Sequence, residues 1–197
     1  MVSVAVGQLM PQVSSPNPSD IRGVNSQTSG ATSPVWRLRM KYAGGVYIPC
    51  AVFRRTPLER ADQDLAWHRD DQWFFAAGAC HILAYAFLET RLPRFSAKGL
   101  WPAEAADPGH VYASDGTWAF DHCGWTLERE LLEVSRAVEP TANYQSRAIR
   151  MGLDELCARH WHRTRAEFLH DPWPRARAYI ALVDSSCQDT RKAGQQL

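Results

Sequence analysis

HVYASDGTWAFD, residues 110–121, is the stretch of sequence that decides the fold, because it predicts a β-hairpin. The Asp-Gly pair at 115–116 separates two runs in which apolar residues alternate. Such a pair suits the positive φ angles of a two-residue hairpin turn. A two-residue turn at this point places His110 directly opposite Asp121 on the neighbouring strand.

The predicted hairpin has one polar and one apolar face. Directly opposed residues of an antiparallel pair share a face, with Cβ atoms about 4.5–5.5 Å apart. We therefore expect the His110 imidazole and the Asp121 carboxylate to hydrogen-bond. A carboxylate at one ring nitrogen fixes the tautomer of a histidine and leaves the other nitrogen free to exchange a proton with a nucleophile. The opposite face must pack on another element, since it carries Val111, Ala113, Trp118 and Phe120.

GACHILAYAF, residues 78–87, supplies the best candidate for that nucleophile. Cys80 is predicted to begin the most apolar helix of the chain, and a helix N-terminus stabilises a thiolate. Gly78 permits close backbone approach, and the Cys80 amide is expected to donate a hydrogen bond to an oxyanion. His81 points about 100° away on the helix, so we interpret it as a neighbour and not as a catalytic group.

The order of these motifs resembles the papain-like cysteine hydrolase superfamily, especially its bacterial transglutaminase-like and NlpC/P60-like branches. There a cysteine at a helix start is followed by a histidine on a strand and an Asp or other polar residue on the next strand. The resemblance covers residues 72–125 and implies Cys80 as nucleophile, His110 as general base and acid, and Asp121 as the group that orients the imidazole. The short separation of Cys80 from His110 implies a reduced sheet, with one intervening strand near Trp101.

The function implied by this resemblance is that of a cysteine-dependent acyl hydrolase or acyl transferase. Peptidases, amidases, deamidases and transglutaminases share this chemistry, and the expected partner is a protein or peptide-like amide substrate, with no cofactor. Candidates for the oxyanion side chain or the substrate cleft are Gln72, Trp73, Gly78, Trp101 and Tyr112. Large aromatic residues beside a hairpin are more often packing residues than cleft walls.

Two other classes of function stay open. A free cysteine in an apolar helix is most often a small buried hydrophobe. The same fold without activity would be a protein-interaction module that binds through its C-terminal helices and its tail. A zinc-binding domain is the third hypothesis, because suitable ligands cluster twice along the chain. The clusters are His110, His122 and Cys123, and Cys157, His160 and His162. Their spacing places members off a shared face, so no metal is expected.

Composition limits the class of protein further. With 197 residues, of which 45% are hydrophobic, the chain is long and apolar enough for one globular domain. Its net charge of +1 supplies no field for an anionic membrane, and nucleic acid is not an expected partner, although residues 147–177 are rich in arginine. The longest apolar run, 73–88, is too short to cross a bilayer. The five cysteines form no CxxC pair, and residues 1–10 show no secretory signal, so a cytoplasmic location is expected.

The predicted organisation is a single papain-like α+β domain, residues 35–187, with a flexible tail at 1–34 and a frayed end at 188–197. Its core is a small antiparallel sheet packed on the central helix that carries Cys80, followed by a helical C-terminal part. The tail is rich in Ser, Pro, Asn and Thr and cannot offset the entropy of ordering. The other expected elements are strands at 35–41 and 46–53, a helix opened by Thr126 and closed by Pro140, one or two helices within 142–170, and a last helix after Pro174.

Overall fold

The computed structural model describes residues 47–90 and 93–194. They all belong to one compact unit, Ser33–Leu197. The tail predicted at 1–34 and the strand predicted at 35–41 lie outside the described residues. No helix in the described part of the chain is both long and apolar enough to cross a bilayer.

The centre of the unit is a five-stranded antiparallel sheet with the strand order β4-β3-β2-β1-β5. Its strands are β1 (Ser96–Trp101), β2 (His110–Ser114), β3 (Trp118–Asp121), β4 (Gly124–Leu127) and β5 (Gln145–Ala148). The expected α+β class with a small antiparallel sheet is thus confirmed. One strand, β1, lies between α4 and β2 along the chain, as the short spacing predicted.

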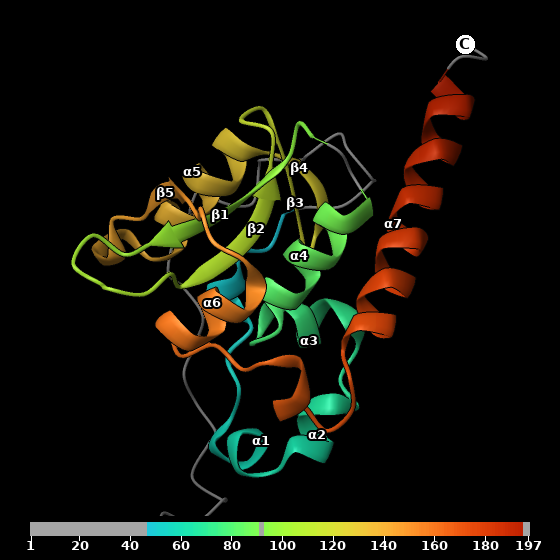
Figure 1. Cartoon of the computed structure of the whole chain (residues 1–197). Helices are drawn as coiled ribbons and strands as arrows, with labels where there is room; N and C mark the ends of the chain where they lie inside the picture. The colour runs from blue at the N-terminus through green and yellow to red at the C-terminus, as the bar shows by residue number, and fades with distance from the viewer. Residues whose placement is uncertain (1–46, 91–92, 195–197) are drawn as a thin grey trace, which may run out of the picture. The chain divides into compact units, whose positions relative to one another are not determined.

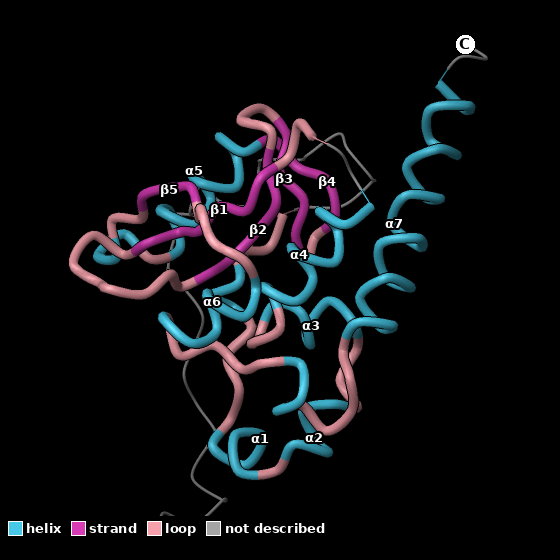
Figure 2. The backbone as a smooth tube through the Cα atoms, in the orientation of Figure 1, coloured by secondary structure: helices cyan, strands magenta, loops and turns pink. Residues whose placement is uncertain are grey.

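Helices lie on both faces of the sheet (Figures 1 and 2). On one face is α4 (Cys80–Thr90), against which α3 (Asp71–Ala76) and α7 (Trp173–Gly194) pack; on the other is α5 (Glu128–Val138). The shorter helices are α1 (Pro57–Ala61), α2 (Gln63–Trp67), α6 (Leu153–Arg159), and the 3-10 turns η2 (Cys50–Val52), η3 (Pro140–Ala142) and η4 (Arg165–Glu167).

Helix α4 is buried on nearly all sides, as its apolar sequence predicts. Ile82 and Leu83 are almost completely buried in the core that joins α3, α4 and α7 to the sheet. The ring of Phe87 stacks on that of Phe120 in β3, with centroids 4.3 Å apart. The apolar face of the hairpin therefore packs against α4, as the sequence predicts. This packing places the N-terminus of α4 beside the start of β2.

The β2–β3 hairpin forms with a register that differs from the predicted one. Ser114 pairs with Ala119 instead of Thr117, so four residues rather than two separate the paired positions. The Asp115 carboxylate accepts hydrogen bonds from the amides of Thr117 (2.9 Å) and Trp118 (2.8 Å), which closes the wider loop. Because the register shift is even, every residue keeps its predicted face.

Residues 47–53, the described part of the strand expected at 46–53, do not form a strand. Pro49 cannot donate to a ladder, and the following residues form η2, in which the Phe53 amide donates to the Cys50 carbonyl at 2.9 Å. The segment is held instead by side chains of β3 and of its connection to β4. His122 Nε2, for example, lies 2.9 Å from the Ile48 carbonyl oxygen. This arrangement brings Cys50 close to His110, the first residue of β2.

Three other boundaries differ from the sequence-based expectations. Thr126 lies in β4, so α5 begins two residues later, at Glu128. Helix was expected throughout 142–170, but β5 forms there and pairs with β1; its sequence, QSRA, has no apolar alternation that would mark a strand. The backbone of α7 is helical to Gly194, past the end predicted to fray at 188.

Glu128 joins α5 to the sheet through a buried polar cluster. Its carboxylate accepts hydrogen bonds from the Lys98 ammonium (2.8 Å), the Tyr112 hydroxyl (3.0 Å), and the hydroxyls of Ser114 (2.6 Å) and Ser146 (2.8 Å). Burial raises the pKa of Glu128, but these donors outweigh burial and lower that pKa. The donors come from β1, β2 and β5, so one carboxylate connects three strands to the helix.

Replacing Glu128 by alanine is expected to lower the free energy of unfolding by about 3 kcal/mol, since it leaves a cation and three hydroxyl groups without their acceptor. Urea denaturation followed by tryptophan fluorescence measures the change. Glu133→Ala on an exposed position of the same helix is the matched control and is expected to change stability by less than about 0.5 kcal/mol. Equal effects of the two substitutions would contradict this role of Glu128.

Candidate active site

A cavity of about 470 Å³ opens beside the N-terminus of α4. Its wall combines η2, α1, the turn before α4 and the segments that precede β2 and β5. The lining residues are Cys50, Ala51, Phe53, Arg54, Arg55, Arg60, Ala76, Ala77, Gly78, Cys80, His81, Gly109, Glu139, Tyr144 and His162. The cavity therefore brings two thiols together with imidazole and guanidinium groups from distant parts of the chain.

Cys80 is the first residue of α4 and is 8% exposed. The first hydrogen bond of this helix runs from the Leu83 amide to the Ala79 carbonyl at 3.1 Å. The amides of Cys80 and His81 therefore have no acceptor within the helix. The positive end of the helix dipole lies at the same place and favours a thiolate or an oxyanion.

His110 and Asp121 form the hydrogen bond that the hairpin predicted. His110 Nε2 lies 2.9 Å from Asp121 Oδ2, and both side chains are completely buried. With the observed register the two residues are diagonal neighbours, so the contact survives although the predicted pairing was wrong. The other ring nitrogen, Nδ1, is buried and makes no hydrogen bond of regular geometry in the described part of the chain.

Asp121 gathers several donors around one carboxylate. Besides His110, the Tyr47 hydroxyl donates to Oδ2 at 3.1 Å, the Cys123 amide donates to Oδ1 at 2.8 Å, and His122 Nδ1 lies 3.3 Å from Oδ2. Burial raises the pKa of Asp121, but the positive charges and hydrogen bonds of His122 and His110 outweigh burial and lower that pKa well below its usual range. The carboxylate is therefore ionised at neutral pH.

The neighbours of His110 and of Cys80 determine the charge states of the imidazole and of the thiol. Burial lowers the pKa of His110, but the sulfur of Cys50, the Asp121 carboxylate and the sulfur of Cys80 together raise it well above its usual value. Burial raises the pKa of Cys80, whereas hydrogen bonding and positive charge from His110 and His81 lower it well below its usual value. An imidazolium and thiolate pair is the charge state that these neighbours favour.

His81 takes a larger part in this site than its place on the helix predicted. Its Nε2 lies 2.7 Å from the Arg163 carbonyl oxygen, and its ring stacks on that of His162 with centroids 4.8 Å apart. Burial lowers the pKa of His81, but the thiols of Cys157 and Cys80 raise it to about 9. The ring of His81 thus lines the cavity next to Cys80, and the loop after α6 holds it there.

Of the predicted cleft residues, only Gly78 lines the cavity. Tyr112 is completely buried, and its hydroxyl serves the Glu128 cluster. Gln72 donates to the sulfur of Cys123 at 3.5 Å, while the ring of Trp73 lies under the Arg69 guanidinium. Neither residue lines the cavity, since it is the last residue of α3, Ala76, that reaches the wall.

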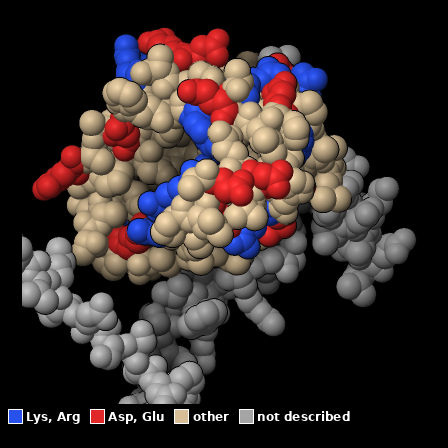
Figure 3. Space-filling view, turned by 90° about the horizontal axis from the view of Figure 1, so that it is seen from below, with Lys and Arg blue, Asp and Glu red and all other residues tan. Residues whose placement is uncertain are grey.

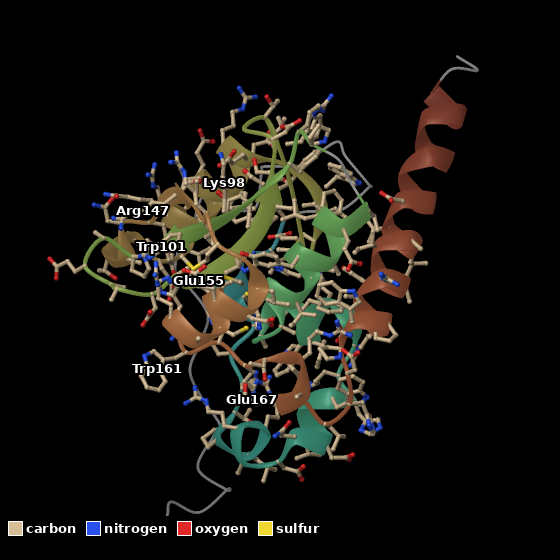
Figure 4. The ribbon with its side chains drawn as sticks, viewed as in Figure 1. Lys98, Trp101, Arg147, Glu155, Trp161 and Glu167 are labelled. Carbon is tan, nitrogen blue, oxygen red and sulfur yellow. The ribbon has the colours of Figure 1, made fainter. Side chains whose placement is uncertain are left out.

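Trp101 also lies away from the cavity lining, although it belongs to the buried cluster that contains Cys80. Its indole NH donates to the Ala106 carbonyl at 3.3 Å, and the Arg147 guanidinium lies over its ring (Figure 4). Trp101 is thus a packing residue at the β1–β5 edge. The hypothesis that Trp101 and Tyr112 form the walls of the cleft was wrong. Trp101 packs at the β1–β5 edge, and Tyr112 donates a hydrogen bond to Glu128.

Several cavity residues were absent from the sequence hypothesis. Cys50 belongs to the strand expected at 46–53, Arg55 follows that strand, and Tyr144 belongs to a segment expected to be helical. They are separated from Cys80 by stretches of chain whose path no local pattern specifies. Cys50 has one signal in the sequence, its proximity to Pro49, which interrupts the predicted strand.

Metal ligation was the third hypothesis, and the structure groups its residues differently. Within the described residues, the one set of three ligand atoms that lie within 4.8 Å of one another is contributed by His110, Asp121 and His122. These are residue types that zinc prefers. Asp121 Oδ2 already lies 2.9 Å from His110 Nε2 and 3.3 Å from His122 Nδ1. Within the described residues, the buried Nδ1 atoms of both histidines make no hydrogen bond of regular geometry. In the predicted second cluster, His160 turns to Asp107 (2.9 Å) and separates from its neighbours.

The described residues thus place the Cys80 thiol at the cavity wall and the hydrogen-bonded pair of His110 and Asp121 in the interior next to it. No protein-family model, curated protein or solved structure matches the chain. The chemistry available at the cavity is nucleophilic attack by sulfur, proton exchange at His110 Nδ1, and anion stabilisation by backbone amides at the start of α4.

Proposed function

We propose that the protein is a cysteine-dependent acyl hydrolase or acyl transferase with a papain-like arrangement of its α4 helix and sheet. Its substrate is a protein or a peptide-like amide. The observation that carries the proposal is the series at the cavity: Cys80 at the helix N-terminus, His110 beside it, and Asp121 2.9 Å from the far nitrogen of His110. Asp121 stabilises the protonated form of His110, and the protonated imidazole stabilises the thiolate of Cys80.

In the first half of the reaction, the Cys80 sulfur attacks the carbonyl carbon, a C–S bond forms, and the carbonyl electron pair moves to oxygen. The amides of Cys80 and His81, which have no acceptor within α4, donate to this oxyanion. The tetrahedral intermediate then collapses and the bond to the leaving amine breaks. His110 Nδ1 gives its proton to that amine, which leaves a thioester on Cys80.

In the second half, a nucleophile cleaves the thioester. His110, now neutral, removes a proton from water in a hydrolase or from an acceptor amine in a transferase. The new bond forms at the carbonyl carbon, the C–S bond breaks, and sulfur leaves as the thiolate. Asp121 keeps the imidazole in one orientation through both halves and stabilises its protonated form.

The pH dependence of cysteine alkylation tests the activated thiol. An ordinary thiol with a pKa near 8.5 loses about 75-fold in thiolate between pH 8 and pH 6. Because the pKa of Cys80 is lowered well below that value, its rate of reaction with iodoacetamide is expected to fall by less than about 3-fold over the same range. Mass spectrometry of peptides from the native protein resolves the rate for each cysteine.

Cys157 is the internal control, because it is buried in the same protein but lies outside the cavity lining. Its sulfur contacts the Arg163 carbonyl at 3.5 Å and also acts on His81. In His110→Ala the pH dependence of Cys80 is expected to approach that of an ordinary thiol. A Cys80 that stays unreactive at every pH while denatured protein labels fully would contradict the proposal and favour the interaction module.

A further inference from the structure

The cavity carries more positive charge than the proposed acyl chemistry requires. Arg54, Arg55 and Arg60 line it, whereas Glu139 is its one acidic lining residue. Glu139 is already engaged, since it pairs with the Arg54 guanidinium and accepts from the Tyr144 hydroxyl at 2.5 Å. In the space-filling view from below, Lys and Arg side chains border a hollow in the surface (Figure 3).

Arg55 lies against the turn that precedes the proposed nucleophile. Its Nε donates to the Ala77 carbonyl at 2.8 Å, which fixes the guanidinium over Gly78, two residues before Cys80. A Cβ at Gly78 would overlap the guanidinium, and the φ of +144° at this position also disfavours any other residue. The glycine that the sequence assigned to backbone approach thus makes room for an arginine.

The remaining donors of Arg55 form no ion pair with a carboxylate among residues 47–90 and 93–184. Burial and the nearby Arg60 lower the pKa of Arg55, against a smaller opposing effect of Glu59. Burial and Arg55 likewise lower the pKa of Arg163, to about 10. A half-buried guanidinium among like charges is stabilised by an anion, and its planar fork suits an oxyanion with two acceptors.

We infer that the cavity binds substrates whose acyl part carries an anionic oxygen group, and that the Arg55 guanidinium holds this group beside Cys80. This inference rests on the proposed function and adds its substrate class. Arg55 acts as a specificity-determining residue, and Gly78 provides its space. A carboxylate or a phosphate group supplies the chemistry that the guanidinium recognises, and the two are separated by experiment.

Calorimetric titration of the full chain with glutarate and, in parallel, with inorganic phosphate tests the anion site without depending on a reactive Cys80. Binding of either anion that weakens about 10-fold in Arg55→Gln is the expected result, and the anion that binds identifies the carboxylate or the phosphate as the preferred group. Arg94→Gln is the control, because it removes one positive charge from an exposed arginine that pairs with Asp115 outside the cavity. Absence of binding by both anions, or equal loss in both variants, would overturn the inference.

Alkylation then connects the anion site to Cys80. Iodoacetate and iodoacetamide deliver the same group to sulfur and differ in charge, so the ratio of their rates at Cys80 reports the local preference for an anion. We expect this ratio, in which any change of the thiolate fraction cancels, to fall about 5-fold in Arg55→Gln and to be largely restored in Arg55→Lys. An unchanged ratio in Arg55→Gln would overturn the link to Cys80. Failure of Cys80 to react with either reagent would instead contradict the proposed function, while the titrations still decide whether the cavity binds anions.

Discussion

Cys80→Ala is expected to reduce acyl-transfer turnover by at least about 1,000-fold, because it removes the only atom proposed to form a bond with the substrate. The substitution deletes one sulfur at a helix start and is expected to cost only about 1 kcal/mol of folding free energy. Turnover of amide and thioester substrates with an anionic acyl part, followed by release of the amine or thiol, measures the effect. Thermal unfolding of the same protein establishes that it remains folded.

The choice of nucleophile is decided by comparing Cys80→Ala with Cys50→Ala. Both sulfurs line the cavity and both act on the charge of His110, but only Cys80 stands at the N-terminus of an eleven-residue helix. Cys157→Ala, a buried cysteine outside the cavity lining, controls for the loss of a thiol as such. Activity that survives in Cys80→Ala and disappears in Cys50→Ala would identify Cys50 as the nucleophile and refute the assignment made here.

Asp121→Asn is expected to have the second largest effect, on both reactivity and stability. The carboxylate is the counter-charge of His110 and lies 3.3 Å from His122. Without it, turnover is expected to fall on the order of 100-fold, and the alkylation rate of Cys80 at pH 6 is expected to fall with it. The free energy of unfolding is expected to decrease by about 3 kcal/mol, since buried cationic rings lose their partner.

The pH dependence of this destabilisation has a definite sign. The folded-state pKa of Asp121 is lowered, so its ionised form contributes stability above the unfolded-state pKa, near 3.9, and loses it as pH falls through the folded-state value. The pKa values of His110 and His122 are raised in the folded state, with Asp121 among the causes, so their contribution is complete below the unfolded-state value near 6.5 and is lost as pH rises. The difference between wild type and Asp121→Asn should therefore be largest between about pH 5 and pH 6.5 and shrink on acidification. Urea denaturation at several pH values measures it, with exposed Asp154→Asn as control. A difference that grows at low pH would contradict the ionised, charge-paired Asp121.

The parts of the site that the sequence could predict are those specified by local periodicity. Alternation along β2 and β3 assigns His110 and Asp121 to one face, and this assignment tolerates the change of register because the change is even. The apolar residues on all sides of α4 likewise predict its burial and the place of Cys80 at its start. In both cases the decisive contacts lie within or between neighbouring elements.

The remaining parts depend on side-chain contacts, both within a loop and between distant segments, that apolar periodicity does not record. The register of the hairpin is decided by the Asp115 side chain, which bonds two amides of its own loop. Residues 47–53 are placed by contacts with the β3–β4 connection, such as that between Ile48 and His122, which lie far apart in sequence. Arg55 is placed by a carbonyl acceptor and by the absence of a side chain at Gly78. The residues of the cavity wall could therefore not be predicted from the sequence, whereas the contact between His110 and Asp121 could.

Because a single strand separates α4 from β2, the proposed nucleophile, base and orienting group all occur between residues 80 and 121, without an intervening domain or long crossover. Contacts of short sequence separation form early when a chain folds. Such a segment can be inherited as one unit, because its reacting atoms are carried by neighbouring elements, α4, β2 and β3. The cavity wall comes largely from chain outside it, so substrate preference can diverge through η2, α1 and the loop after α6 while the chemistry stays unchanged.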